Sequence, residues 1–226
     1  MNLDLTKITL NYQRGEHVVR AVHDVSLTVA AGEFVAIQGS SGAGKSSLLL
    51  VAGGLLRPTE GQVKIEGQDL YEQPSEQRAA FRAKHIGIIF QRFHLLPYLS
   101  VRQNILTPTL AVSLPDAEVR AEQLIAKFGL EHRSQHQPSR LSAGECQRVA
   151  TARALLANPK VILADEPTGN LDRENSAIVL DAIRAAVDAG SAAILVTHDE
   201  QAAARADRVL HMRDSQITTS EQVATE

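Results

Sequence analysis

The sequence has very little cysteine: Cys146 is the single one in 226 residues. One cysteine cannot form a disulfide bond within the chain, so the fold does not depend on an oxidising compartment.

An excess of charge of either sign is also missing, because 23 Lys and Arg residues stand against 26 Asp and Glu residues, a formal net charge of −3. This balance argues against a surface built mainly to bind nucleic acid, and no nucleic-acid partner is expected.

Long hydrophobic runs are absent as well. The longest apolar stretch, residues 48–56, is about half of the roughly 20 residues that a membrane helix needs, and Gly53 and Gly54 interrupt it. The first residues carry neither the basic segment nor the apolar segment of a secretory signal. The sequence therefore predicts a cytoplasmic globular protein, in which any membrane role depends on a separate subunit.

What is present is an alternation of apolar strands and helical patterns. Strands are predicted over residues 5–12, 18–29, 34–38, 63–65, 86–90, 161–164, 192–196 and 209–212. Helices are predicted from 45 to the glycines at 53 and 54, across most of 101–156 with breaks at Pro115, Gly129 and Pro138, over about 173–188, and from 200 onward. The first two strands form an antiparallel hairpin, and the later alternation is typical of an α/β fold with a mostly parallel, helix-covered sheet. The polar end after Asp214 is expected to be flexible.

A glycine-rich loop follows the predicted strand 34–38 and opens a helix. It fits the phosphate-loop pattern G-x-x-x-x-G-K-[ST] at every fixed position, with the residues Gly39, Ser40, Ser41, Gly42, Ala43, Gly44, Lys45 and Ser46. The backbone N–H groups of such a loop and the helix N-terminus bind phosphate through fixed dipoles. Lys45 is predicted to contact the β- and γ-phosphates, and the Ser46 hydroxyl to bind Mg²⁺. Ser47, the next residue, is also predicted to bind the nucleotide.

The predicted strand 161–164 ends in two carboxylates, Asp165 and Glu166. Ligands of a doubly wound sheet bind beyond the carboxyl ends of its strands, so these acids are expected at the same edge as the phosphate loop. Asp165 is predicted to bind Mg²⁺, and Glu166 to polarise an attacking water as a general base. The alternative is a polar turn over 165–170 without a ligand, which the neighbouring phosphate loop disfavours.

A second candidate site begins at Ser142. Ser142 and Glu145 form the S-x-x-E pattern of a capping box, which accounts for both residues without any ligand. The other interpretation is that Ser142, the Gly144 amide and the helix N-terminus form a second anion-binding face. Spacing alone leaves both alternatives open.

Together these motifs resemble the ATP-binding subunit of ATP-binding-cassette (ABC) transporters, and more closely the lipoprotein-releasing and macrolide-exporter group (LolD/MacB-type), which includes the cell-division ATPase. The resemblance covers essentially residues 1–214. Three segments match further family motifs: Gln91 the Q-loop, 141–147 the signature motif, and 169–172, which includes Asp172, the D-loop. Two single residues match as well, Tyr12 as the aromatic that stacks on adenine and His198 as the switch histidine. Ala143 stands where the family usually has glycine, and Cys146 where a polar residue is common. The Ala143 methyl is expected to weaken closure around a nucleotide.

The resemblance implies a P-loop NTPase core of the ABC ATPase type, with an antiparallel β subdomain and an inserted α-helical subdomain at about 92–157. The whole chain, 1–226, would form one nucleotide-binding domain with a flexible tail at 215–226. It further implies a head-to-tail homodimer, in which ATP is bound between the phosphate loop of one chain and Ser142 and Gly144 of the other, with Asp172 near the nucleotide.

The family also assigns roles to single residues and to a partner. Gln91 would contact Mg²⁺ and the attacking water, and His198 would contact the γ-phosphate. The stretch near 93–98, which is expected to be helical, would receive the coupling helix of an integral membrane permease.

The expected function is therefore an ATP-hydrolysing motor on the cytoplasmic face of the inner membrane. One alternative is a soluble ABC ATPase without a permease, which usually has tandem cassettes or a long coiled-coil insertion that this sequence lacks. Another is a regulatory ATP-binding module such as the cell-division type, which the presence of both Glu166 and His198 makes less favoured. A GTPase is disfavoured because no N-K-x-D motif occurs.

Overall fold

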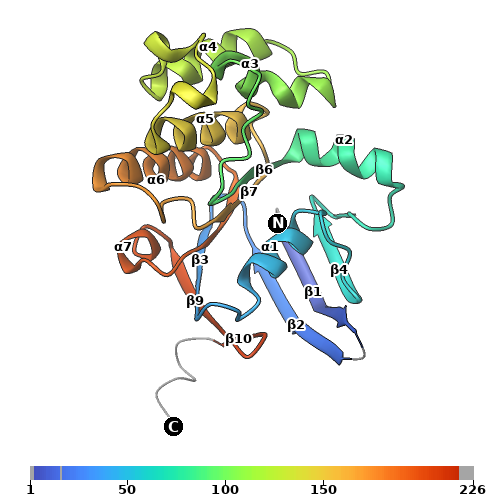
Figure 1. The fold of residues 1–226 in the computed structure, drawn as a ribbon. Helices are drawn as coiled ribbons and strands as arrows, with labels where there is room; N and C mark the ends of the chain where they lie inside the picture. Colours follow the sequence, from blue (N-terminus) through green and yellow to red (C-terminus); the bar gives the residue numbers. More distant parts are fainter. Residues whose placement is uncertain (1–2, 16, 219–226) are drawn as a thin grey trace.

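The computed structural model describes residues 3–15 and 17–218, which form two sheets and the helices that cover them (Figure 1). The smaller sheet is antiparallel and has the strand order β2-β1-β4-β5. Its strands are β1 (Leu3–Arg14), β2 (His17–Val29), β4 (Glu60–Ile65) and β5 (Gln68–Asp69). The predicted hairpin is thus confirmed, since β1 and β2 pair directly.

The larger sheet has six strands in the order β10-β9-β3-β8-β7-β6, and the five strands from β9 to β6 are parallel. Its strands are β3 (Phe34–Gln38), β6 (Ile86–Ile89), β7 (Val161–Asp165), β8 (Ala192–Val196), β9 (Arg208–Arg213) and β10 (Gln216–Thr218). Every residue of β8 is buried, as expected for a strand with both faces covered.

Alternate residues of the central strands face two different hydrophobic cores. Val35 and Ile37 pack into the core that holds α1 (Lys45–Ala52) and the antiparallel sheet. Phe34 and Ile162 pack into the core that holds α5 (Ala143–Leu155) and α6 (Arg173–Asp188). This period of two follows from the strand geometry and places α1 and α6 on opposite faces of the sheet.

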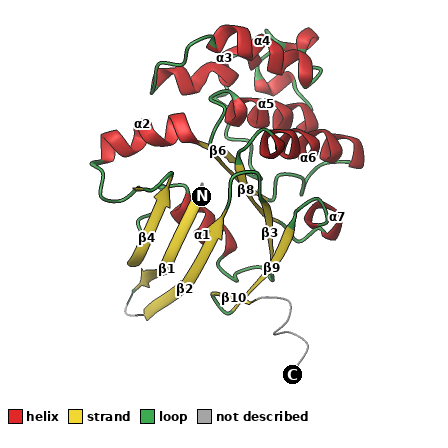
Figure 2. Cartoon of the chain, turned by 180° about the vertical axis from the view of Figure 1, so that it is seen from behind, coloured by secondary structure: helices red, strands yellow, loops and turns green. Residues whose placement is uncertain are grey.

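The remaining helices are α2 (Ser75–His85), α3 (Val101–Leu106), η1 (Thr107–Leu110), α4 (Ala117–Lys127), η2 (Glu131–Arg133), η3 (Pro138–Arg140) and α7 (Glu200–Ala203). Of these, α3 and α4 lie in a layer beyond α5 and α6, whereas α2 and α7 lie on opposite sides of the molecule (Figures 1 and 2). The part of the chain between β6 and β7 is mostly helical, and in this helical part α5 packs against both α3 and α4. Across residues 3–15 and 17–218, no helix is both long and apolar enough to cross a membrane.

The expectation of a flexible tail from residue 215 is wrong for its first part. Gln216–Thr218 forms β10, which pairs with β9 across a turn at Asp214 and Ser215. Ser215 is anchored to β2, because its hydroxyl donates to the Arg20 carbonyl at 2.8 Å and its own carbonyl accepts from His23 N at 2.8 Å. The rest of the predicted tail, 219–226, lies outside the described residues.

Residues 93–98 form an extended loop rather than the expected helical stretch. His94 has a φ of 46°, and Pro97 disfavours helical geometry in the residue before it. The fully buried Asn104 of α3 replaces the missing helical hydrogen bonds. Its Oδ1 accepts from Leu96 N at 2.7 Å, and its Nδ2 donates to the carbonyls of Leu96, Leu99 and Ser100, each at 3.1 Å.

Replacement of Asn104 is expected to be strongly destabilising. Asn104→Ala leaves buried backbone groups of the loop without partners, so the free energy of unfolding falls by roughly 2–4 kcal/mol. Urea unfolding followed by circular dichroism measures the loss. The matched control is His132→Ala, at an exposed position of the same helical part, which should stay within about 0.5 kcal/mol of the wild type. Equal stability of Asn104→Ala and this control would contradict the loop-anchoring role.

Candidate active site

The phosphate loop lies between the end of β3 and the start of α1, as the sequence predicts. Gly44, the residue before the helix, has a φ of 101°. A Cβ there would lie 1.9 Å from the Ala21 carbonyl oxygen of β2, so no residue with a side chain fits. This close approach packs the loop directly against β2 of the antiparallel sheet.

Lys45 is buried, and its ammonium group lies within the loop itself. Its Nζ donates to the Gly39 carbonyl at 2.8 Å and to the Ser40 carbonyl at 2.9 Å. The Lys45 ammonium group is therefore held at the phosphate loop, beside the N-terminus of α1. This combination is suited to the phosphates of a nucleotide.

Ser46 and Asp165 join the loop to the carboxyl end of β7. The Ser46 hydroxyl donates to Asp165 Oδ1 at 3.0 Å. Burial raises the pKa of the Asp165 carboxyl, and the hydrogen bond from Ser46 offsets this only in part. A hydroxyl and a carboxylate are the oxygen ligands that Mg²⁺ prefers, and Mg²⁺ takes its remaining ligands from water and phosphate. The donor set at this point therefore fits Mg²⁺.

Glu166 and His198 come from the ends of the neighbouring strands β7 and β8. Glu166 N donates to the Val196 carbonyl at 2.9 Å, which fixes the turn, and Glu166 has a φ of 47°. His198 Nδ1 lies 2.9 Å from Glu166 Oε1. The Glu166 side chain is 17% exposed and that of His198 is 71% exposed, so the histidine is the outer member of the pair.

Lys45, Ser46, Glu166 and His198 line one cavity of about 630 Å³, whereas Asp165 does not line it and is joined to it through its hydrogen bond with Ser46. The cavity is lined by Tyr12, Val19, Arg20, Ala21, Gly39, Ser41, Gly42, Gly44, Lys45, Ser46, Ser47, Gln91, Glu166, Val196 and His198. Tyr12 lies at its edge, where its hydroxyl is 3.3 Å from Ser47 Oγ. Gln91 follows β6, and its Nε2 approaches the turn after Glu166 at Gly169. Most of the predicted site residues are therefore brought together.

Sequence reasoning missed the β2 residues that line the cavity, Val19, Arg20 and Ala21. Val19 of β2 pairs with Tyr12 of β1. The pairing of the predicted hairpin strands could therefore have indicated that the β2 residues opposite Tyr12 lie near the nucleotide. Two residues of the phosphate loop do not line the cavity. Ala43 is 6% exposed and packs in the core, so only its backbone is available, and Ser40 is exposed beside the cavity.

The structure does not bring Ser142, Gly144 or Asp172 to the cavity of their own chain. The capping box of α5 is present, because Glu145 N donates to Ser142 Oγ at 3.2 Å and Ser142 N donates to Glu145 Oε2 at 2.7 Å. Asp172 caps α6, and the hydrogen bonds from Asn175 lower its pKa. The capping interpretation of Ser142 is thus confirmed, and the exposed helix end keeps its positive dipole.

Two further residues of α5 have structural roles. A Cβ on Gly144 would lie 2.5 Å from Asn175 Cγ, so glycine at this position lets the first turns of α5 and α6 pack together. Cys146 is 7% exposed, and burial raises the pKa of its thiol. It is therefore an unreactive core residue.

The fold and the cavity define a nucleotide-binding domain of the P-loop class. A family model described as ABC transporter matches residues 22–169. The chain is 44% identical over 217 residues to macrolide export ATP-binding/permease protein MacB 1 of Yersinia pestis bv. Antiqua (strain Antiqua), and 42% identical over 217 residues to MacB of Shigella flexneri. These alignments cover 95% of the chain but only 33% and 34% of those relatives, so the chain spans about a third of their length.

Solved structures agree with this assignment. A dimeric post-hydrolysis state of the ATP-binding cassette MJ0796, bound to ADP and Pi, superposes with a TM-score of 0.88 at 34% identity, covering 95% of this chain and 96% of that one. A second dimeric structure of MJ0796, described as a bacterial ABC transporter cassette, also has a TM-score of 0.88, at 35% identity. The chain therefore belongs to the ABC transporter family. It is an ATP-binding ABC ATPase domain of the MacB/LolD-like kind.

The raised pKa of Asp165 predicts a pH-dependent effect on stability. Folding makes this carboxyl bind its proton more tightly, so the ionised form destabilises the free chain at neutral pH, and the penalty disappears as the pH falls below the unfolded pKa of about 3.9. Asp165→Asn should therefore raise the melting temperature at pH 7, with a gain that shrinks toward pH 4. Calorimetry without nucleotide measures it.

The control for this prediction is Asp214→Asn, which changes an exposed carboxylate. It should leave the melting temperature unchanged at both pH values. A melting temperature of Asp165→Asn below that of the wild type at pH 7 would show that the carboxylate is net stabilising, contrary to the burial argument.

Proposed function

We propose that the chain is the ATP-hydrolysing motor of a transporter of the lipoprotein-release or macrolide-export type, working as a homodimer on a membrane permease at the cytoplasmic face of the inner membrane. The observation that carries the proposal is the single cavity in which Lys45, Ser46, Glu166 and His198 meet. The relatives named macrolide export ATP-binding/permease proteins support the group, and the dimeric MJ0796 structures support the assembly.

In this proposal the cavity residues have different roles in ATP hydrolysis. Lys45 and the amides of the phosphate loop bind the phosphates, and Tyr12 stacks against the adenine. Ser46, Asp165 and Gln91 would hold Mg²⁺, which would neutralise charge on the phosphate oxygens. The Glu166 carboxylate accepts a proton from the attacking water, and the neighbouring His198 donates a hydrogen bond to the γ-phosphate.

A second chain completes the site in this proposal. The exposed Ser142 and the buried Gly144 lie outside the cavity of their own chain, at a helix N-terminus whose dipole favours a negatively charged group. In a head-to-tail dimer this end faces the γ-phosphate bound by the partner chain, with Asp172 beside it. The cap and the anion site are then compatible uses of the same helix end.

Glu166→Gln tests both the chemistry and the dimer. The amide cannot accept the proton, so turnover falls by roughly 10²–10⁴-fold whereas ATP binding remains. The unhydrolysed ATP holds the dimer together, so size-exclusion chromatography with ATP and Mg²⁺ shows a dimer. Ser142→Arg added to Glu166→Gln is the matched variant: its bulk at the interface returns the chain to a monomer that still binds ATP. Unchanged turnover of Glu166→Gln would remove Glu166 from the mechanism.

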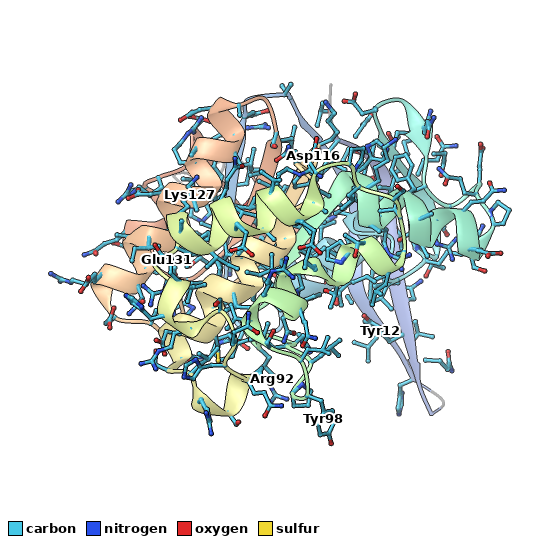
Figure 3. The ribbon with its side chains drawn as sticks, turned by 90° about the horizontal axis from the view of Figure 1, so that it is seen from above. Tyr12, Arg92, Tyr98, Asp116, Lys127 and Glu131 are labelled. Carbon is cyan, nitrogen blue, oxygen red and sulfur yellow. The ribbon has the colours of Figure 1, made fainter. Side chains whose placement is uncertain are left out.

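A groove next to the helical part is the proposed docking site of the permease. It has a volume of about 490 Å³ and runs between α2, η1 and α5. The proposed docking surface also includes two strongly exposed apolar side chains outside the groove lining: Tyr98 is 87% exposed and Leu110 is 83% exposed. Figure 3 shows Arg92 and Tyr98 together at one edge of the molecule, with Tyr98 directed outward. A short apolar permease helix fits a surface of this kind.

Tyr98→Glu tests the docking surface. A charge placed at its most exposed apolar position should lower co-purification with the permease by at least about 10-fold, because hot-spot aromatics contribute ~2 kcal/mol or more. Val18→Glu, at a 62% exposed position of β2, is the matched control. Thermal melts confirm that both variants are folded. Equal recovery of the permease with both variants would place the docking site elsewhere.

A further inference from the structure

Helix α5 bonds to the segment Phe90–His94 through two side chains. The fully buried Gln147 donates from Nε2 to the Phe90 carbonyl at 3.3 Å. Arg153, almost two turns further along the helix, donates from Nη1 to the His94 carbonyl at 2.6 Å and from Nη2 to the Phe93 carbonyl at 2.9 Å. The same helix therefore holds this segment at both of its ends.

Gln91 lies between these two anchors. It is exposed and lines the ATP cavity, whereas the backbone on either side of it is bonded to α5. Beyond His94 the loop is held separately by Asn104. The position of Gln91 in the cavity is thus set by α5, a helix whose other end carries Ser142.

Arg153 is an unusual residue for a purely structural role. It is half-buried, burial lowers the pKa of its guanidinium, and among the described residues no carboxylate pairs with it. A desolvated charge is unfavourable unless its donors are bonded, and an apolar residue of similar size would serve simple packing better. The guanidinium of Arg153 instead donates through two separate N–H groups to two successive backbone carbonyls, those of Phe93 and His94.

We propose that Gln147 and Arg153 are positioning residues for Gln91: they fix the Q-loop backbone to α5, so that Gln91 and the Ser142 end of the helix move as one body. The inference rests on the proposed function, in which Gln91 contacts Mg²⁺ and the attacking water. It predicts that loss of either anchor acts through Gln91 and not through ATP binding.

The test uses the purified full chain and compares Arg153→Met, Arg153→Lys and Gln147→Met, each alone and combined with Gln91→Ala. Arg153→Met removes both hydrogen bonds and keeps the bulk. It should lower kcat by roughly 3–10-fold and raise the Mg²⁺ concentration for half-maximal rate by a similar factor, with the KM for ATP within about 2-fold. Arg153→Lys, which can bond one carbonyl, should recover part of the loss. In the Gln91→Ala background neither anchor variant should lower kcat further.

The control is Arg102→Met, which removes an arginine of the same helical part that is bonded to Glu118 and Glu122 on its surface. It should leave kcat and the Mg²⁺ dependence unchanged. Equal effects of Arg153→Met and Arg102→Met, or losses that multiply with that of Gln91→Ala, would overturn the positioning role. If Arg153→Met does not fold in a thermal melt, Gln147→Met decides the same question. Absence of ATP hydrolysis by the wild type would instead contradict the proposed function.

Discussion

The parallel pairing of β3, β6, β7 and β8 is the constraint on which the site depends. Because these strands run in one direction, their carboxyl ends lie at one edge of the sheet, and each passes directly into a segment that carries a site residue. The phosphate loop, Gln91, the Asp165–Glu166 pair and His198 are distant in sequence, yet they meet there without any long loop. The buried apolar strands thus fix the geometry, and the polar residues only extend from them.

Much of this arrangement could be predicted from the sequence, for a physical reason. Strands β3 and β8 and helix α6 were predicted with the bounds that the structure has, because a continuous apolar run or a strong helical period ends at glycine or at a polar turn. The phosphate loop was predictable because each of its fixed positions needs a property that few residues have: a backbone without a side chain for the glycines, a long cation for the lysine and a hydroxyl for the serine. In such segments the local pattern and the tertiary environment agree.

Other features depend on contacts that no local pattern encodes. The helix α2 has no fully buried residue, and its single large apolar side chain, the half-buried Phe81, is too little apolar pattern to predict a helix. The loop at 93–98 is held by Asn104 from a neighbouring helix, and β10 exists because β9 offers a free edge. Val19 reaches the cavity only because the hairpin folds over the phosphate loop. For Ser142, the cap and the proposed anion site use the same helix end, so the sequence could not separate them.

The burial of Cys146 has a practical consequence for experiments on this protein. Its thiol is shielded and its raised pKa keeps it protonated at neutral pH, so maleimide reagents will react slowly with it. A cysteine introduced at an exposed position will therefore be labelled selectively in the otherwise native chain. Fluorophores or spin labels can then test in real time whether two subunits approach as the proposed dimer requires, with every native residue of α5 left in place.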